Sequence, residues 1–294
     1  MKEIDQLTVI VPAFNEAQSL PLLLQELVPY CDERNWKIIV VNDGSKDNSK
    51  EILNRYTEHV RFRVVHHKLN KGYGAALKSG LLICETQFAV TIDADGQHYL
   101  EDIDRLLTRM IINDADLVVG SRKGSVSRSS YRGLGKSMIR FLAKVLMTVP
   151  IHDLNSGMKI YRTDLAKKYI HLAPDTMAFS DIITLVFINN RHLVLEEPIR
   201  IRKRKSGNST ISLQTAFQTI MEIINIVILF SPMKIFLPLS LLCFIITGLW
   251  GIPLLIGGRG LSIGTLLGVI LGILLFLLGL IAEQLSLIRR KLHD

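Results

Sequence analysis

Short apolar runs alternate with helical patterns through the first two thirds of the chain. Short, mainly apolar runs of four to six residues predict buried strands at residues 7–12, 37–41, 63–66, 88–92 and 116–119. Between these runs, apolar residues recur at helical spacing and predict helices over residues 19–30, 48–57, 73–84 and 100–113. Strands that alternate with helices are typical of an α/β fold with a mostly parallel, Rossmann-like sheet.

The pattern changes sharply after residue 211. Residues 235–255 and 261–282 are two apolar runs without a charge, and each has roughly 20 residues, enough for a helix that spans a bilayer. Only the short segment 256–260 links them. We therefore expect a transmembrane hairpin. The alternative is a buried pair of helices in a soluble core, which seldom contains two such runs in succession.

Two further segments, residues 137–149 and 211–230, have the spacing of amphipathic helices. Each could lie in the membrane interface or cover the sheet, and the second leads directly into the expected hairpin. We therefore expect three parts: an α/β domain over residues 1–210, an interface helix over residues 211–232, and a hairpin with a basic tail over residues 233–294.

Charge indicates which side of the membrane holds the large domain. The apolar run 7–11 is too short for a signal peptide, so the domain is expected to stay in the cytoplasm, where it is made. Basic residues at 200–205 and 289–291 fit the positive-inside rule, and Arg259 in the far loop is a weak counter-signal.

The formal net charge of +8 is explained by anionic headgroups or a phosphate substrate beside a membrane, and we expect no nucleic-acid partner. The three cysteines have no metal-binding spacing and are expected to be ordinary buried residues in a reducing compartment.

Polar motifs follow four of the predicted strands, at residues 14–16, 42–44, 93–95 and 120–122. In open α/β sheets, ligands bind outside the carboxyl ends of the strands. The sequence therefore predicts one composite site built from four strand ends.

The motif after the fourth strand suits a metal. Asp93 and Asp95 lie on one side of an extended segment, and Gln97 follows at the same period. Carboxylate and amide oxygens suit a divalent cation whose other ligands are phosphate oxygens. Such an aspartate pair is also common in ordinary loops, and its position after a strand is what favours the metal. His66, His67 and His98 have no matching spacing and are interpreted as non-ligands.

Two other motifs suit a nucleotide. The carboxylate of Asp43 can accept a hydrogen bond from a base N–H or a ribose hydroxyl, although an ordinary strand-to-helix turn is the alternative. Residues 70–74 open a helix, and the glycines there allow close backbone approach to an anion at the helix N-terminus. Their spacing differs from the dinucleotide fingerprint.

These motifs, in this order, resemble family 2 glycosyltransferases with the GT-A fold. The resemblance rests on residues 12–16, 42–45, 70–74, 93–98 and 120–122. Residues 153–159 and 204–209, with the C-terminal hairpin, narrow it to the branch similar to dolichyl-phosphate mannose synthase, the polyisoprenyl-phosphate glycosyltransferases. The resemblance covers nearly the whole chain.

The resemblance implies a role for each matching residue. Asp93, Asp95 and Gln97 would hold Mg²⁺ or Mn²⁺, and Arg204 would close over the donor diphosphate. Catalysis would depend on Asp95, Asp153 and Arg204. The acceptor phosphate would be bound by Arg122, Arg132 and Ser137. The nucleotide-sugar would be bound by Pro12, Ala13, Phe14, Glu16, Val41, Asp43, Lys71, Gly72, Gly74, Asp93, Ala94, Asp95 and Arg204.

The chain departs from the family pattern at three places. Asn42 precedes Asp43 where relatives often have a second aspartate, Tyr99 follows His98 where many have prolines, and Thr210 stands where many have a lysine. Arg122, Arg132 and Lys136 lie in a basic stretch that could draw a lipid phosphate into the site. Arg128 and Arg140 in that stretch are interpreted as a solvated basic face.

The implied reaction is an inverting sugar transfer from a nucleotide-sugar, with UDP favoured over GDP, to an undecaprenyl- or dolichyl-type phosphate. A phosphate is already ionised near neutral pH, so no strong general base is needed. Asp153 would then orient the acceptor or the sugar, or it simply flanks a helix. The chain would be a membrane-bound hexosyltransferase.

Two other functions remain open. A processive polysaccharide synthase of the same fold would need several channel helices and a Gln-x-x-Arg-Trp motif, which neither Trp36 nor Trp250 provides. A non-catalytic scaffold that binds nucleotide-sugar is disfavoured by the intact pair of aspartates. The glycines at 264, 268 and 272 either permit close packing of helices, as in a homo-oligomer, or reflect ordinary membrane composition.

Overall fold

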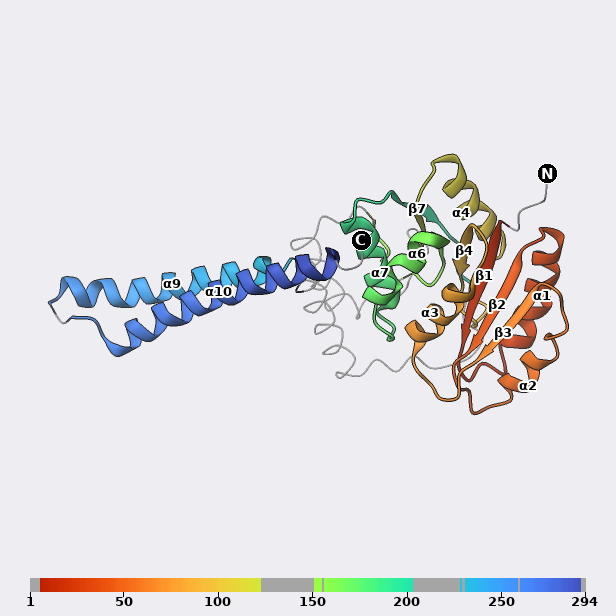
Figure 1. Cartoon of the computed structure of the whole chain (residues 1–294), viewed down its shortest axis with the longest axis horizontal. Coiled ribbons are helices and arrows are strands. Elements are labelled where there is room, and N and C mark those ends of the chain that lie inside the picture. Colours follow the sequence, from red (N-terminus) through yellow and green to blue (C-terminus); the bar gives the residue numbers. More distant parts are fainter. Residues whose placement is uncertain are drawn as a thin grey trace. The chain divides into compact units, whose positions relative to one another are not determined.

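The computed structural model describes residues 6–122, 151–154, 156–202, 228, 231–258 and 260–291. Their elements belong to two compact units: a sheet unit, and a hairpin unit made of two long helices (Figure 1). The strands are β1 (Leu7–Ala13), β2 (Lys37–Asn42), β3 (Phe62–His66), β4 (Phe88–Thr91), β5 (Leu117–Ser121), β6 (Lys159–Arg162) and β7 (Val194–Pro198). The helices are α1 (Leu20–Glu33), α2 (Ser49–Asn54), α3 (Tyr73–Ile83), α4 (Glu101–Ile112), α6 (Thr163–Tyr169), the short 3₁₀ helix η2 (Ile170–Leu172), α7 (Phe179–Asn189), α9 (Met233–Ile256) and α10 (Ile263–Lys291).

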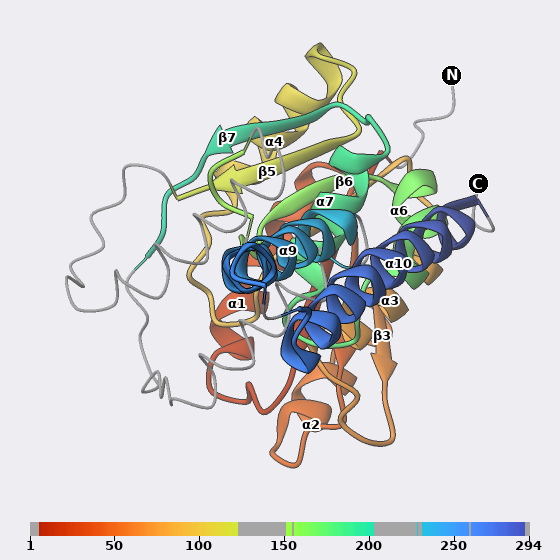
Figure 2. The same cartoon turned by 90° about the vertical axis from the view of Figure 1, so that its left-hand side faces the viewer.

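The sheet unit has one seven-stranded sheet in the order β3-β2-β1-β4-β6-β5-β7. Every neighbouring pair is parallel except the two that contain β6, which runs antiparallel to both β4 and β5. The order of β7, β5 and β6 can be followed in Figure 2. The expected mostly parallel α/β sheet is confirmed, and β6 and β7 are additions that the apolar pattern did not reveal.

Successive side chains on a strand point to opposite faces of the sheet, and helices pack on both faces. On one face, Leu7, Val9 and Val11 of β1 join a core formed with α1 and α4. On the other face, α3 packs on β1 and β2, because Gly80 lets the helix approach closely: a Cβ there would lie 2.5 Å from Ile10 Cγ2. The outcome is a three-layer α/β/α unit whose strand ends are held rigidly.

The nine predicted strands and helices of residues 7–119 are all present, with ends shifted by a few residues. The predicted helices at 137–149 and 211–230 lie outside the described residues, apart from residue 228. Cys31 and Cys84 are buried free thiols, as expected, and Cys243 is half-buried in α9.

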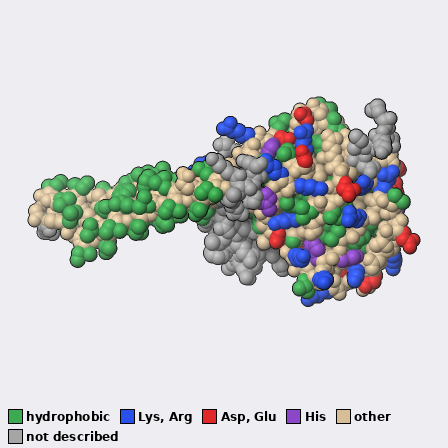
Figure 3. Space-filling model, in the orientation of Figure 1, with side chains coloured by type: hydrophobic (Ala, Val, Ile, Leu, Met, Phe, Trp, Pro, Cys, Tyr) green, Lys and Arg blue, Asp and Glu red, His purple; other side chains and the backbone are tan. Residues whose placement is uncertain are grey.

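In the hairpin unit, α9 and α10 are the two expected apolar helices. Their mean hydropathies over the best windows are 2.3 and 2.8, and only 11% and 17% of those windows are buried. Hydrophobic side chains cover the face of the hairpin seen in Figure 3. These helices are therefore long and apolar enough to cross a membrane, and they are too exposed to be a soluble core pair.

Small residues bring α9 and α10 together. A Cβ at Gly268 would lie 2.2 Å from Thr247 Oγ1, and one at Gly272 would lie 2.8 Å from Phe244 Cε1. Ser240 Oγ donates to the carbonyl of Gly272 at 2.8 Å. Gly268 and Gly272 therefore serve packing within the hairpin, whereas Gly264 meets only its own neighbour Ser262. Oligomerisation stays a prediction.

Candidate functional site

The topology of the sheet determines where a ligand would bind. The chain moves from β1 outward to β2 and β3, then returns to add β4 on the other side of β1. Such a switch point leaves a crevice outside the carboxyl ends of the two central strands. We call this end of the sheet the carboxyl end; β1, β2, β4 and β5 finish there, and the antiparallel β6 begins there.

At the carboxyl ends of β1 and β2, two loops are tied together. Asn15 donates its backbone N–H to Ser45 Oγ, and its side-chain oxygen accepts from Lys46 N. Ala17 N donates to Asp47 Oδ2 at 2.9 Å. Phe14 stands out from this frame with 43% of its surface exposed, whereas Ala13 and Val41 are buried. An exposed aromatic ring on a rigid loop is suited to contact with a flat base.

Asp43 has a different environment from the one its motif suggests. It is only 2% exposed, and its carboxylate accepts from Lys71 N at 2.9 Å and Gly72 N at 2.8 Å. The ring of His67 lies 2.6 Å from the same carboxylate and 2.9 Å from Ser79 Oγ. Asp43 therefore anchors the turn before α3, and its predicted contact with a nucleoside stays a prediction.

Glycines make that turn possible. Gly44 has φ +68°, and a Cβ on it would lie 2.4 Å from the carbonyl carbon of Leu69. Gly72 has φ +103°, and a Cβ on it would lie 2.4 Å from the backbone oxygen of Asp175. Any other residue would be strained or would clash at both positions. At these two glycines the backbone packs closely on the protein's own loops, at residues 69–70 and 174–176, and the approach of residues 70–74 to an anion stays a prediction.

The predicted metal ligands follow β4. Asp93 accepts from Tyr73 Oη at 3.0 Å, and His98 Nε2 lies 3.4 Å from its other oxygen. Burial tends to raise the pKa of Asp93, but His98, Tyr73 and Arg122 outweigh it and lower that pKa. Burial and Asp93 together raise the pKa of Tyr73 well above its ordinary value. The carboxylate is therefore kept ionised.

The donor set fits a divalent cation. Asp95 Oδ1 accepts the nearby Gln97 N–H at 3.1 Å, and a carboxylate has further lone pairs that can bind a cation. Among the described residues, no group of three or more histidine, cysteine or acidic side chains could hold a metal. A cation held by Asp93, Asp95 and Gln97 would therefore take its remaining ligands from phosphate oxygens or water.

Arg122 and Asp153 form a two-pronged ion pair where β5 ends. Arg122 Nε and Nη2 each donate to the Asp153 carboxylate at 2.7 Å, and Arg122 N donates at 3.0 Å. The hydrogen bond to Asp153 raises the pKa of Arg122. Burial tends to raise the pKa of Asp153, but Arg122 outweighs it and lowers that pKa. Asp153 thus orients the cation that was predicted to bind the acceptor phosphate.

Two charged residues of this region were missed from the sequence. Lys159 opens β6 and is fully buried; burial lowers its pKa to about 7, while Asp181 and Asp153 act in the opposite direction. The charge of Asp181, in the first turn of α7, acts on both Lys159 and Arg122. Lys159 ends the motif at residues 153–159, but its burial among polar partners arises from the fold, and no local pattern could show it.

The basic segment that follows β7 begins beside residues 93–98, which we call the aspartate loop. Arg202 N donates to Gln97 O at 2.8 Å, and Ile201 forms an isolated antiparallel β-bridge with His98. The guanidinium groups of Arg200 and Arg202 lie 4.5 and 4.6 Å from the centre of the Tyr99 ring. Arg204 comes two residues later and lies outside the described residues, as do Arg132, Ser137, Arg128, Lys136 and Arg140.

Comparison with known proteins assigns the fold to a family. The sequence model of Glycosyl transferase family 2 matches residues 8–170, more than half of the chain. The chain belongs to that family. A second model, the GtrB C-terminal hairpin, matches residues 231–288, which contain α9 and most of α10. The protein is therefore a glycosyltransferase with a C-terminal hairpin, as the motifs predicted.

Curated relatives of this glycosyltransferase share most of its length. It is 29% identical to a dolichyl-phosphate beta-glucosyltransferase of Trichomonas vaginalis, over 76% of this chain and 71% of that protein. It is 33% identical to the polyprenol monophosphomannose synthase of Mycolicibacterium smegmatis, over 69% and 80%. It is 27% identical to an undecaprenyl-phosphate 4-deoxy-4-formamido-L-arabinose transferase of Sodalis glossinidius, over 76% and 68%.

Solved structures confirm the fold of the sheet unit. Glucosyl-3-phosphoglycerate synthase from Mycobacterium tuberculosis, crystallised with Mn²⁺, UDP-glucose and phosphoglyceric acid, superposes with a TM-score of 0.55 at 16% identity, over 76% of this chain and 80% of that one. S. aureus TarS 1–349 superposes with a TM-score of 0.52 at 19% identity, over 77% and 72%. At this identity, the likeness supports the GT-A-like fold alone.

Proposed function

We propose that this glycosyltransferase transfers a sugar from a nucleotide-sugar to the phosphate of a polyisoprenyl lipid. One observation carries the proposal: a family 2 domain and a GtrB-type hairpin occur in one chain. Relatives over most of that chain are named for dolichyl, polyprenol or undecaprenyl phosphate acceptors. A hairpin of two apolar helices suits an enzyme whose acceptor is a lipid.

In this proposal the donor lies at the carboxyl ends of β1, β2 and β4. Phe14 and Glu16 contact the nucleoside from the first loop, and the anchored turn at residues 71–74 faces the donor. We favour a UDP-sugar over a GDP-sugar. Arg204 approaches the donor diphosphate from the segment that starts at Arg202, which is hydrogen-bonded to Gln97 O. The nearness of that anchor to the aspartate loop supports the assignment.

Asp93, Asp95 and Gln97 would hold the divalent cation, Mg²⁺ or Mn²⁺. When bound, the cation would neutralise negative charge on the diphosphate as it departs. Tyr73 and His98 keep Asp93 oriented and ionised for that ligand.

The acceptor phosphate is bound by Arg122, with Arg132 and Ser137 as further predicted contacts. Asp153 engages Nε and Nη2 of Arg122. A guanidinium suits a phosphate because its planar N–H fork pairs with two oxygens at once. A lipid phosphate is ionised near neutral pH, and none of these residues has to remove a proton from it.

The reaction would be a direct displacement. A phosphate oxygen of the lipid forms a bond to the anomeric carbon, while the bond from that carbon to the donor diphosphate breaks on the opposite face. The anomeric centre is inverted, and the nucleoside diphosphate leaves with the electron pair. The residues described here act by holding the two anionic reactants close together in line.

We further propose that the catalytic domain (residues 1–210) lies on the cytoplasmic side, with α9 and α10 crossing the membrane. The basic residues near both ends of the hairpin support that orientation. Residues 211–232 would then lie in the interface before α9.

A transfer assay tests the proposal. The purified protein in detergent is supplied with Mn²⁺ or Mg²⁺, undecaprenyl phosphate, and each of a panel of UDP- and GDP-sugars. A glycolipid from one donor, lost with a chelator and in Asp95→Ala, is the expected result. If nucleotide binds but no donor yields a glycolipid, lipid phosphate is not the acceptor, and a scaffold or another acceptor would explain the chain better.

A further inference from the structure

Lys159 is the most unusual side chain of the sheet unit. It is 0% exposed, at the first position of β6. Its Nζ lies 2.6 Å from Leu154 O, 2.5 Å from Ser180 O and 2.8 Å from Thr184 Oγ1. Three acceptors match the three N–H donors of an ammonium group. Every donor of this buried group therefore has a partner.

A buried lysine needs a reason beyond packing. Lysine is among the residues that are almost never fully buried without partners, because the charge must leave water. A methionine of similar length would fill the same volume without that cost. The two carboxylates that act most strongly on this lysine, those of Asp181 and Asp153, belong to the candidate site.

The three acceptors belong to two separate segments. Leu154 lies in the loop that leads into β6, and we call its described residues, 153–154 and 156–158, the lead-in loop. Ser180 and Thr184 belong to the first turns of α7. A further hydrogen bond, from Ser180 Oγ to Ser156 O at 2.8 Å, joins the same two segments. Lys159 therefore fastens the lead-in loop onto α7.

The lead-in loop touches both halves of the site. Its first residue, Asp153, holds Arg122 through two hydrogen bonds of 2.7 Å. Near its other end, Gly157 lies so close to Asp93 that a Cβ would be 2.2 Å from Asp93 Oδ2. A shift of this loop would move Arg122, through Asp153, and would also move the backbone of Gly157 that packs against Asp93.

We propose that Lys159 is a positioning residue for sugar transfer: its buried ammonium fixes the lead-in loop on α7 and so places the Asp153–Arg122 pair. Its kinetic consequence rests on the proposed function, because it requires that Arg122 bind the acceptor phosphate. The fastening itself does not depend on that function and can be measured separately.

The experiment compares Lys159→Met with Thr86→Val in the full-length protein. Thr86 is also buried, with hydrogen bonds of 2.7 Å to Thr8 and to Phe88 O, but it lies at the opposite end of β4. Thr86→Val thus controls for the loss of a buried hydrogen-bonded group. Thr184→Val removes one acceptor of Lys159 and keeps the charge.

We expect Lys159→Met to lower kcat/KM for the lipid phosphate by about 100-fold, since a misplacement of about 1 Å can have such an effect. The affinity for the donor nucleotide, measured by calorimetry, should stay that of the wild type. Thr184→Val should show a smaller loss of the same kind. Thr86→Val should lower the melting temperature without changing kcat/KM for the lipid phosphate or the affinity for the donor nucleotide.

Hydrogen exchange gives a readout without turnover. Lys159→Met should speed exchange in peptides that cover residues 153–158 and the first turn of α7, and Thr86→Val should not. Unchanged exchange there, or acceptor kinetics equal to those of the wild type, would overturn the proposal. So would an activity loss that merely follows the folded fraction. If the wild type itself makes no glycolipid, the proposed function fails, and the exchange data alone decide the role of Lys159.

Discussion

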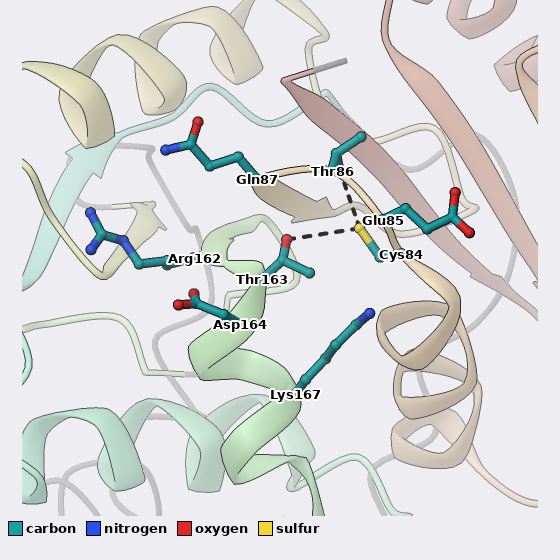
Figure 4. A pocket seen from close by; sticks show the side chains of 8 residues that line it. All are labelled: Cys84, Glu85, Thr86, Gln87, Arg162, Thr163, Asp164 and Lys167. Carbon is teal, nitrogen blue, oxygen red and sulfur yellow. Dashed lines mark hydrogen bonds between the residues drawn. The ribbon is translucent and has the colours of Figure 1, made fainter. Parts of the chain in front are cut away.

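The two ends of the sheet contrast sharply. At the carboxyl end, Asp93, Arg122 and Asp153 come from three separate segments. Arg122 is hydrogen-bonded to Asp153, and its charge also lowers the pKa of Asp93. At the amino end, a cavity of about 510 Å³ is lined by residues of only two stretches (Figure 4). Those residues are Cys84, Glu85, Thr86, Gln87, Arg162, Thr163, Asp164 and Lys167.

The difference teaches that volume alone does not locate the chemistry. The cavity at the amino end has charges of both signs, and its lining residues pair with near neighbours, as Cys84 does with Thr86 and Thr163 and Arg162 with Asp114. The carboxyl end instead concentrates ionised groups of both signs around the switch point of the sheet. Charges that converge from distant parts of the sequence are what a transfer between two anions requires.

The largest effect should come from the aspartate loop. Asp95→Ala removes a predicted metal ligand and should lower glycolipid formation by about 1,000-fold, because charge on the leaving diphosphate would lose its counter-charge. Asp164→Asn at the amino end is the matched control and should retain wild-type activity. Equal losses in the two variants would erase the contrast between the two ends.

A smaller effect is expected at the acceptor side. Arg122→Lys keeps a positive charge but loses the planar fork that pairs with Asp153. We expect the KM for lipid phosphate to rise about 10-fold to 100-fold, with donor affinity retained. Steady-state kinetics with each substrate varied in turn would check this. A rise confined to the KM for the donor would contradict the prediction, because it would show that Arg122 binds the donor and not the acceptor.

The Asp153 pair should also appear in the pH dependence of stability. The folded pKa of Asp153 lies below its ordinary value of 3.8, so the ionised form is stabilised by folding. Its contribution is complete above that value and is lost as the pH falls through the folded pKa. Melting temperatures of the wild type should therefore exceed those of Asp153→Asn at about pH 6, and the gap should narrow below about pH 4. A gap that is constant with pH would contradict the ion pair.

The smallest effect is expected at the cavity. Lys167→Ala removes a charge that lines it and should change neither kcat nor KM for either substrate, as measured in the transfer assay. A loss of turnover in this variant would show that the amino end takes part in the reaction, and the contrast drawn here would fail.

Much of the sheet unit could be predicted because most of the strands of residues 7–121 are short, mainly apolar runs, and β1, β2, β4 and β5 are followed at once by polar motifs. The ends of β1, β2, β4 and β5 all lie at the carboxyl end of the sheet, as the pattern predicted, with β6 between β4 and β5. The hairpin was equally predictable, since two uncharged runs of that length have few alternatives.

The rest depended on long-range contacts. β6 has four residues with a basic residue at each end, so no hydrophobic period marks it. Likewise, His67 meets Asp43 only through the fold. Asn42, which departs from the family pattern, is explained by the structure: its side chain accepts from Ser45 N and pairs with His66. A second carboxylate there would lack the N–H₂ donor.

The antiparallel course of β6 has a consequence for engineering. β5 ends and β6 begins at the same end of the sheet, where Gly120 N donates to Met158 O and Arg122 grips Asp153. Residues 122 and 153, which bound the connection between these strands, are therefore held next to each other. We expect such a connection to be exchangeable between homologues as one piece, because both splice points are held by the recipient's sheet, which stays unchanged.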